Sequence, residues 1–298
     1  MEDSISREVR VISDSDIKNI TVPFSTNHPS RQMSNIEYDW IPLTFLNLVV
    51  QSGFIPKSKP LSTLLVAHAG LGKTIKLETL RQFDFVKYTL DITPKIIAEF
   101  LNDVQDGKKM FLVIPDYIAT LSHSKRTVEL ARSIFRAMME EGVTDVDIFG
   151  MVCHFKTKIR AGLISGITPE YYNENTRVWK SDGFLQRFIP FSYSHKPSTT
   201  NSVLDNIKNN IDTVSTFDMK IRTKDVYTPV RKEEIDDKIR LIMYSILEPK
   251  EPPYRLYLQL ISLCNASAIL RDSKEVTTID TDLVKLFANY INRGQTPI

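Results

Sequence analysis

The chain has 298 residues, enough for a large α/β domain and a smaller one, and its 42% hydrophobic content is that of an ordinary globular protein. Its 38 lysines and arginines nearly balance 36 aspartates and glutamates, so the net charge of +2 excludes a global field that would attract nucleic acid or an anionic membrane. The polar, acidic N-terminus does not follow a signal-peptide pattern, and no apolar run reaches the length of a membrane span. We therefore expect a cytoplasmic protein with no membrane contact, in which any contact with nucleic acid is local.

Four segments follow one another along the chain. Residues 1–40 are rich in Ser, Asn and Asp and predict an N-terminal arm, which is a candidate contact for a protein partner. Residues 41–195 alternate strand-like and helix-like stretches, which predicts an α/β core with a mostly parallel sheet and helices on both faces. Residues 196–232 are polar and predict a connector with one short helix. Residues 233–298 predict a small helical lid, interrupted by the proline-rich stretch EPKEPP.

The stretch LLVAHAGLGKTIKLETL, residues 64–80, contains in order the parts of a phosphate-binding P-loop: an apolar strand end, a loop of small residues, and Gly-Lys-Thr at the start of a helix. Lys73 is expected to contact the β- and γ-phosphates of ATP, and the Thr74 hydroxyl to bind Mg²⁺. The expected nucleotide-binding residues of the loop are Ala67, His68, Ala69, Gly70, Leu71, Gly72, Lys73 and Thr74. Ala67 stands where the strict pattern has glycine, and it fits if its φ is negative. The alternative is a strand-to-helix turn with no ligand.

A P-loop ATPase also needs carboxylates at the end of a neighbouring strand, one to organise Mg²⁺ and one to activate water. The stretch KKMFLVIPDYIATL predicts a buried strand ending at Asp116, but it supplies one acid where two are usual. If Asp116 binds the metal, the catalytic base is missing; if Asp116 is the base, the magnesium ligand is missing. Glu140 or Glu141 could compensate, and Asp116 could instead be an ordinary strand-end cap. The sequence therefore predicts ATP binding and leaves hydrolysis open.

Several further landmarks, in order, resemble the AAA+ ATPases over about residues 41–298, and within them the minichromosome-maintenance-like helicase branch. The stretch ARSIFRAMMEEGVTDVDIFGMVCHFKTKIRAGLISGITPEYY looks like the helix, β-hairpin insertion and sensor-1 strand of that branch. GFLQRFIPFSY resembles the segment that carries the arginine finger, and YRLYLQLISLCNASAILRDSKEVTTIDTDLVKLFANYI resembles the helical lid.

The resemblance implies roles at the nucleotide for three residues, catalytic for Arg187 and Thr168 and nucleotide-binding for Arg255. Arg187 would be the arginine finger that reaches the γ-phosphate bound by the adjacent subunit, and Arg255 would be the sensor-2 arginine of the lid. Thr168 stands at the sensor-1 position, where asparagine is usual. The resemblance also implies a homo-oligomer, either a ring or a helical filament of hexamer-like form. The local alternatives are a surface ion pair for Arg187, a solvated helix start for Arg255 and a turn residue for Thr168.

A short basic row occupies the expected hairpin. Lys156, Lys158 and Arg160 alternate as they would on one face of a strand. In the family that the chain resembles, this hairpin points into a central pore and touches the DNA backbone. A local basic row suits phosphate contact even in a nearly neutral chain. A solvated strand face or ion pairs between subunits would use the same residues.

These expectations combine into an AAA+ P-loop ATPase that couples the binding and hydrolysis of Mg-ATP to movement of its lid and hairpin. The expected substrate is DNA, which an oligomer would translocate, load or remodel in the replication of a plasmid, virus or mobile element. The alternative is a nucleotide-gated adaptor or scaffold that oligomerises with ATP, hydrolyses little and recruits a protein partner. The incomplete acid pair favours the scaffold, whereas Arg187 favours hydrolysis because an arginine finger acts mainly in the transition state.

Overall fold

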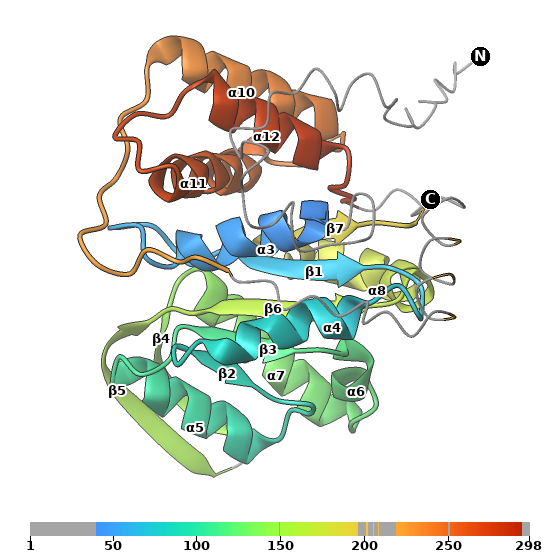
Figure 1. Cartoon of the computed structure of the whole chain (residues 1–298). Helices are drawn as coiled ribbons and strands as arrows, with labels where there is room; N and C mark the ends of the chain where they lie inside the picture. The colour runs from blue at the N-terminus through green and yellow to red at the C-terminus, as the bar shows by residue number, and fades with distance from the viewer. Residues whose placement is uncertain are drawn as a thin grey trace.

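The computed structural model describes residues 40–148, 150–195, 201, 205, 208, 219–249 and 251–293. A five-stranded sheet with the order β2-β3-β6-β1-β7 forms its centre, and each neighbouring pair of strands is parallel (Figure 1). The strands are β1 (Ser62–Val66), β2 (Val86–Tyr88), β3 (Phe111–Ile114), β6 (Gly162–Ile167) and β7 (Phe188–Ser192). The parallel α/β core predicted from the alternating sequence pattern is therefore confirmed.

Helices cover both faces of this sheet because successive side chains of a buried strand point to opposite sides. Leu64 and Val66 of β1 belong to one hydrophobic cluster with residues of α5, α7 and α8, whereas Leu65 belongs to a second cluster with α3 and α4. The helices of the core are α3 (Trp40–Ser52), α4 (Lys73–Glu78), η1 (Thr79–Gln82), α5 (Pro94–Gln105), α6 (Tyr117–Leu121), α7 (Lys125–Met139), α8 (Pro169–Ser181) and η2 (Leu185–Arg187), where η denotes a 3₁₀ helix.

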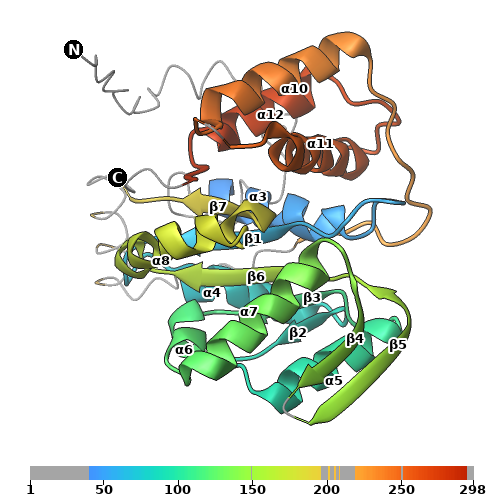
Figure 2. The ribbon, with the colours of Figure 1, turned by 180° about the vertical axis from the view of Figure 1, so that it is seen from behind.

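The C-terminal helices pack on the core through α3, which lies between them and the sheet (Figures 1 and 2). They are α10 (Glu233–Ile246), α11 (Pro253–Leu270) and α12 (Thr278–Ala288), and the predicted proline-rich break separates α10 from α11. Every residue of α3 is buried. Phe45 of α3 stacks on Phe191 of β7 at a centroid distance of 4.2 Å and meets Phe287 of α12 edge to face at 5.5 Å. The C-terminal helices therefore belong to the same hydrophobic cluster as α3 and α4 and, within the residues that the structure describes, form no separate cluster of their own.

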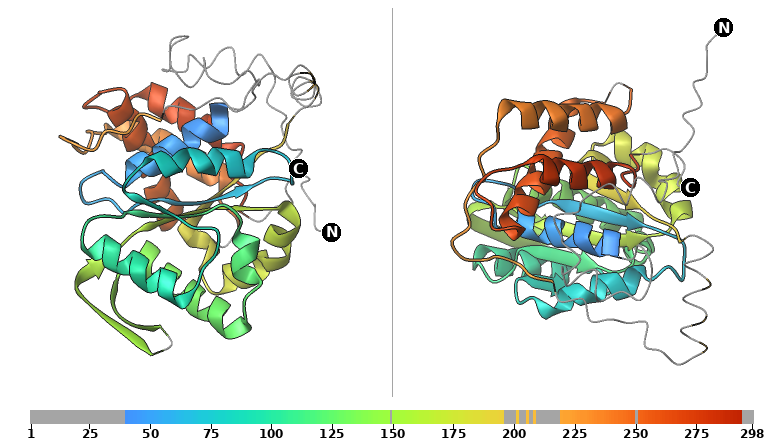
Figure 3. Two further views of the ribbon diagram at one scale, coloured as in Figure 1. Left: turned by 60° about the horizontal axis from the view of Figure 1, so that its bottom comes forward. Right: turned by 45° about the horizontal axis from the view of Figure 1, so that its top comes forward.

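A two-stranded antiparallel hairpin is inserted between α7 and β6, as the resemblance predicts. Its strands are β4 (Val143–Ile148) and β5 (Met151–Ile159). The hairpin does not join the central sheet; it extends beyond it, with β5 lying along α5 (Figure 3). Gly150 in the turn has φ +86, a backbone conformation that glycine adopts without steric cost.

Parts of the predicted organisation fall on residues that the structure does not describe. These are the N-terminal arm up to residue 39 and most of the connector, in which the expected short helix would lie. Within the described ranges, no helix combines the length and the apolar character that crossing a membrane would require.

Candidate functional site

The predicted phosphate loop lies at the carboxyl edge of the sheet, where residues 67–72 connect β1 to α4. At the end of β1, Val66 pairs with Ile167 of β6 on one side and Ser192 of β7 on the other. The Ala67 N–H donates to the Ile167 carbonyl at 3.2 Å and extends this pairing into the loop. Ligands of open parallel sheets bind beyond the carboxyl ends of the strands, so the loop has the position that such a ligand requires.

The backbone of the loop turns at two glycines with positive φ, Gly70 at +82 and Gly72 at +72. A Cβ atom at Gly70 would meet no other atom within 4 Å, so this turn is open rather than packed. Ala67 is not among the described residues with positive φ, and its side chain is buried. The condition under which alanine could replace the usual first glycine is therefore met.

Lys73 begins α4, and its side chain turns back into the loop. Its Nζ donates to the carbonyl oxygens of Ala67 and, at 2.9 Å, of His68. Burial lowers the pKa of Lys73, while the negative charges of Asp116 and Glu170 act in the opposite direction. The ammonium group is thus held by loop carbonyls in the field of two carboxylates. The following residue, Thr74, is exposed beside it.

Asp116 follows β3, where it caps a helix and also lies at the edge of the sheet that carries the loop. It is the N-cap of α6, since its Oδ1 accepts a hydrogen bond from the Ile118 N–H at 3.0 Å. Because β3, β6 and β1 are parallel, Asp116 also lies at the same edge of the sheet as the loop, and its negative charge acts against the lowering of the Lys73 pKa. No group of three or more His, Cys, Asp or Glu side chains suited to a metal ion occurs in the described part of the chain. A P-loop magnesium site needs fewer protein ligands, because phosphate and water oxygens complete it, and Thr74 and Asp116 offer the oxygen donors that Mg²⁺ prefers.

Thr168 lies at the carboxyl end of β6, the strand between β1 and β3, as expected for a sensor-1 residue. A second residue of this segment, Glu170 in the first turn of α8, was not singled out from the sequence. Glu170 Oε1 lies 3.2 Å from Nδ1 of His68 in the loop. Hydrogen bonds from its own N–H and from the Thr168 hydroxyl lower the pKa of Glu170, and His68 adds to this effect. The structure thus brings a second carboxylate to the loop.

The two arginines that the resemblance assigned to ATP lie elsewhere, at the amino edge of the sheet. Arg187 immediately precedes Phe188, which pairs with Ser62, the first residue of β1. The five residues of β1 separate this edge from the loop, a span of roughly 16 Å at ~3.3 Å per residue. Arg187 therefore cannot contact a nucleotide held by its own loop.

Both arginines are held by the same carboxylate (Glu140). Arg255 Nε donates to Glu140 Oε1 at 2.7 Å, and Arg187 Nε lies 3.1 Å from Glu140 Oε2. Arg187 also donates to Glu141 Oε1 at 2.9 Å and to the carbonyl of Gly183 at 2.6 Å. The described contacts of Arg187 are thus within the chain, as in the ion-pair alternative, although that ion pair is largely buried.

The suggestion that Glu140 or Glu141 replaces the missing acid is wrong for the loop of the same chain. Both follow α7 at the amino edge, where Arg187 and Arg255 are their partners. Burial raises the pKa of Glu140, but the hydrogen bond and charge of Arg255, with the charge of Arg187, outweigh burial and lower it. A sequence shows that two acids follow a helix, but not at which edge of the sheet the helix ends.

The basic row of the hairpin divides into two parts. All three side chains are exposed, and Lys156 and Lys158 lie on β5. Arg160 lies at the base of the hairpin, where its guanidinium group donates to the carbonyl oxygens of Glu140 and Glu141 at 2.9 and 3.3 Å. Asp145 of β4 pairs with His154 of β5 at 2.7 Å, so the same hairpin also carries negative charge. The two lysines are the part of the row available for phosphate contact.

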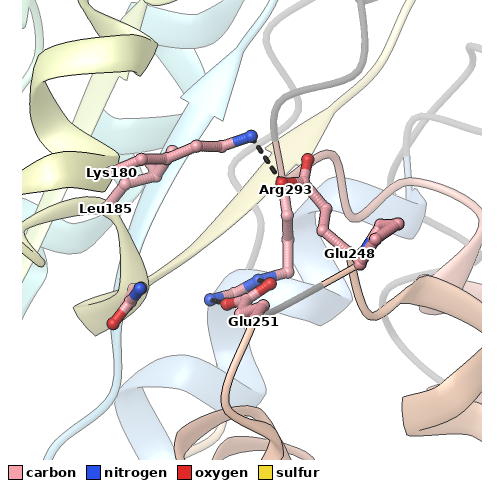
Figure 4. A pocket seen from close by; sticks show the side chains of 7 residues that line it. Lys180, Leu185, Glu248, Glu251 and Arg293 are labelled. Carbon is pink, nitrogen blue, oxygen red and sulfur yellow. Dashed lines mark hydrogen bonds and ion pairs between the residues drawn. The ribbon is translucent and has the colours of Figure 1, made fainter.

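A small pocket lies at the junction between the core and the lid rather than at the loop (Figure 4). Lys180 of α8 forms an ion pair with Glu248 at 2.6 Å, and Arg293 Nε donates to Glu251 at 3.0 Å. The first ion pair ties the loop between α10 and α11 to α8 of the core, and Arg293 also donates to the carbonyl of Phe188 in β7 at 3.3 Å. Because its charges pair with one another, this pocket is not the candidate phosphate site.

No protein-family model matches this sequence, and no curated protein is significantly similar to it.

Proposed function

We propose that the chain is a P-loop ATPase that binds Mg-ATP at the loop between β1 and α4. The observation that carries this proposal is the position of Lys73, whose ammonium group lies inside the loop at the carboxyl edge of β1, in the field of Asp116 and Glu170. A lysine so placed can exchange two loop carbonyls for phosphate oxygens. A plain strand-to-helix turn would give no reason to partly bury a charged ammonium group there, because burying a charge costs free energy.

The residues around the loop have distinct tasks in this proposal. The turn at Gly70 and Gly72 lets backbone N–H groups face the phosphates, and Lys73 neutralises charge on the β- and γ-phosphates. Thr74 and Asp116 hold Mg²⁺, which supplies further neutralisation of the phosphate charge when bound. In this proposal Thr168, which follows the adjacent strand β6, detects the γ-phosphate.

The finer proposal is an AAA+ ATPase that works as a homo-oligomer on DNA. Two features that the resemblance implies support it: the hairpin inserted between α7 and β6, and the helical lid after β7. Because Arg187 lies too far from its own loop, an arginine finger at this position requires a neighbouring copy of the chain. The exposed lysines of the hairpin support DNA as the substrate.

Steady-state ATP hydrolysis with and without single- and double-stranded DNA tests this proposal, with Lys73→Ala as the blank. We expect turnover above the blank and its stimulation by DNA. ATP binding without turnover under every condition would exclude the motor, and the same weak binding in the wild type and Lys73→Ala would exclude the nucleotide site itself.

A second function, a nucleotide-gated scaffold, is favoured by one specific observation: Glu140 and Glu141 hold Arg187 within its own chain. A chain whose finger stays held in this way would bind ATP, oligomerise and hydrolyse little. Light scattering with ADP, ATP and a non-hydrolysable ATP analogue separates the two functions. A scaffold would keep its ATP-dependent size for hours, whereas a motor would return to the ADP state as ATP is consumed.

The hairpin lysines give a direct test of DNA contact. In Lys156→Ala/Lys158→Ala we expect weaker DNA binding and a salt slope reduced by about 1.4 for single strands and about 1.8 for duplex DNA, since each lost phosphate contact removes about 0.7 or 0.9. The affinity for ATP should not change. The matched control is Lys95→Ala/Lys125→Ala, which removes two positive charges from exposed lysines on α5 and α7. Equal effects of the two double variants would show that net charge, and not the hairpin, governs DNA binding.

A further inference from the structure

We propose that Glu170 is the second acid of the ATPase site and holds the attacking water, in place of the carboxylate that is missing beside Asp116. This inference rests on the proposed ATPase function and assigns a residue that the sequence pattern did not identify. The two acids then follow two neighbouring strands, Asp116 after β3 and Glu170 after β6, whereas the usual pair follows a single strand.

The sheet brings these two strand ends together. In the register of β3 and β6, Ile114 is opposite Ser165, so the chain continues past Gly166 beside Pro115. A Cβ atom at Gly166 would lie 2.5 Å from the Pro115 carbonyl oxygen, which shows how closely the segment before Asp116 approaches β6. The absence of a side chain at Gly166 permits this approach.

From this position Glu170 reaches the loop. Its Oε1 lies 3.2 Å from His68 Nδ1, and the Thr168 hydroxyl hydrogen-bonds its carboxylate. Glu170 and Asp116 are the two acids whose charges act on the Lys73 ammonium group. The Glu170 side chain is 61% exposed, so water reaches it. A carboxylate near the phosphate-binding lysine, open to water and oriented by a neighbouring hydroxyl, has the properties needed to position a nucleophile.

Other carboxylates near the core do not have these properties. Asp116 is needed for Mg²⁺ with Thr74, and one carboxylate cannot both bind the ion and hold the water on the far side of the γ-phosphate. Glu140 and Glu141 lie at the opposite edge of the sheet with arginine partners. Glu174, the next acid along α8, is exposed and is a full turn further from the strand end.

The chemical step in this assignment is hydrolysis of the β–γ phosphoanhydride. The oxygen of the water held by Glu170 forms a bond to the γ-phosphorus, and the bond from that phosphorus to the β-bridging oxygen breaks with its electron pair remaining on ADP. One proton of the water passes to the Glu170 carboxylate and then to solvent. The products are ADP, inorganic phosphate and a proton, with no further reactant.

The test compares Glu170→Gln with the wild type and with Glu174→Gln, which changes an exposed glutamate of the same helix in the same way. Glutamine keeps the size of the side chain and an oxygen that can accept from His68, but it takes up no proton. We expect Glu170→Gln to lower turnover about 100-fold or more, the usual contribution of a positioned acid or base. The dissociation constant of a fluorescent ATP analogue and the rise in melting temperature with Mg-ATP should stay at wild-type values. Glu174→Gln should resemble the wild type in every measurement.

Each contrary result has its own meaning. Wild-type turnover in Glu170→Gln overturns the assignment while leaving the ATPase intact. Turnover lost together with ATP binding or thermal stability also overturns it, because Glu170 would then support the loop through His68. ATP binding by the wild type without turnover above Lys73→Ala shows that Glu170 does not replace the missing acid, although the nucleotide site stands. Failure of the proposed function itself would appear differently, as ATP binding that is unaffected by Lys73→Ala.

Discussion

Lys73→Ala should weaken the binding of Mg-ATP by about 100-fold. Hydrogen bonds to charged groups contribute about 1.5–3 kcal/mol each, and ~2.7 kcal/mol corresponds to a factor of about 100 in affinity. The fold should tolerate the change, because the side chain lies at the loop and its described hydrogen bonds go only to the carbonyls of Ala67 and His68. Fluorescence titration with an ATP analogue gives the affinity, and the melting temperature without nucleotide reports the fold.

The matched control is Lys95→Ala on α5, a lysine whose side chain is 82% exposed. It removes the same charge from the chain but not from the loop, so its affinity for ATP should remain that of the wild type. In thermal melts, Mg-ATP should raise the melting temperature of the wild type and of Lys95→Ala but not of Lys73→Ala, since a ligand stabilises only a folded state that binds it. An equal rise in melting temperature in all three proteins would show that the nucleotide binds elsewhere on the chain. No rise in any of them would show that it does not bind.

The strands and the loop could be predicted from the sequence because their signals are local. An apolar run followed by small residues and Gly-Lys-Thr predicts β1, the turn and the start of α4 within a short window, and the structure has all three. The prolines after α10 likewise predict the break before α11. The hairpin and the helical lid are predicted from the order of the segments that resemble a known family. The described elements occur in that order.

The candidate site could be predicted only in part, because it depends on which strands are neighbours. Glu170 follows β6, far along the chain from His68, and only the parallel pairing of β6 with β1 places the two side chains 3.2 Å apart. The same sequence allows Glu140 as a replacement for the missing second acid, yet the helix before it ends at the amino edge of the sheet. Pattern and spacing along the chain do not specify the edge of a sheet at which a helix ends.

Arg187→Ala should lower ATP turnover by about 1000-fold while leaving ATP affinity within a few-fold of the wild type, because an arginine finger contributes mainly in the transition state. A structural loss has to be separated from this effect. The side chain of Arg187 is 11% exposed and is paired with Glu140, so its removal also disturbs a largely buried ion pair. Arg187→Lys keeps the positive charge without the planar fork, and should therefore retain more stability than alanine but little more activity.

Mixing two inactive variants decides whether Arg187 acts across subunits. Asp116→Asn damages the metal site of its own loop but carries an intact Arg187, whereas Arg187→Ala carries an intact loop. If each site takes its finger from a neighbour, an oligomer of both variants contains some complete sites, and turnover should reappear on mixing, with a maximum near equal amounts. For Arg187 to reach a neighbour, it must first leave Glu140 and Glu141. Glu141→Gln weakens one of these ion pairs, so its turnover should be higher than that of the wild type. No recovery on mixing, together with unchanged turnover in Glu141→Gln, would leave Arg187 as a structural ion pair and favour the nucleotide-gated scaffold.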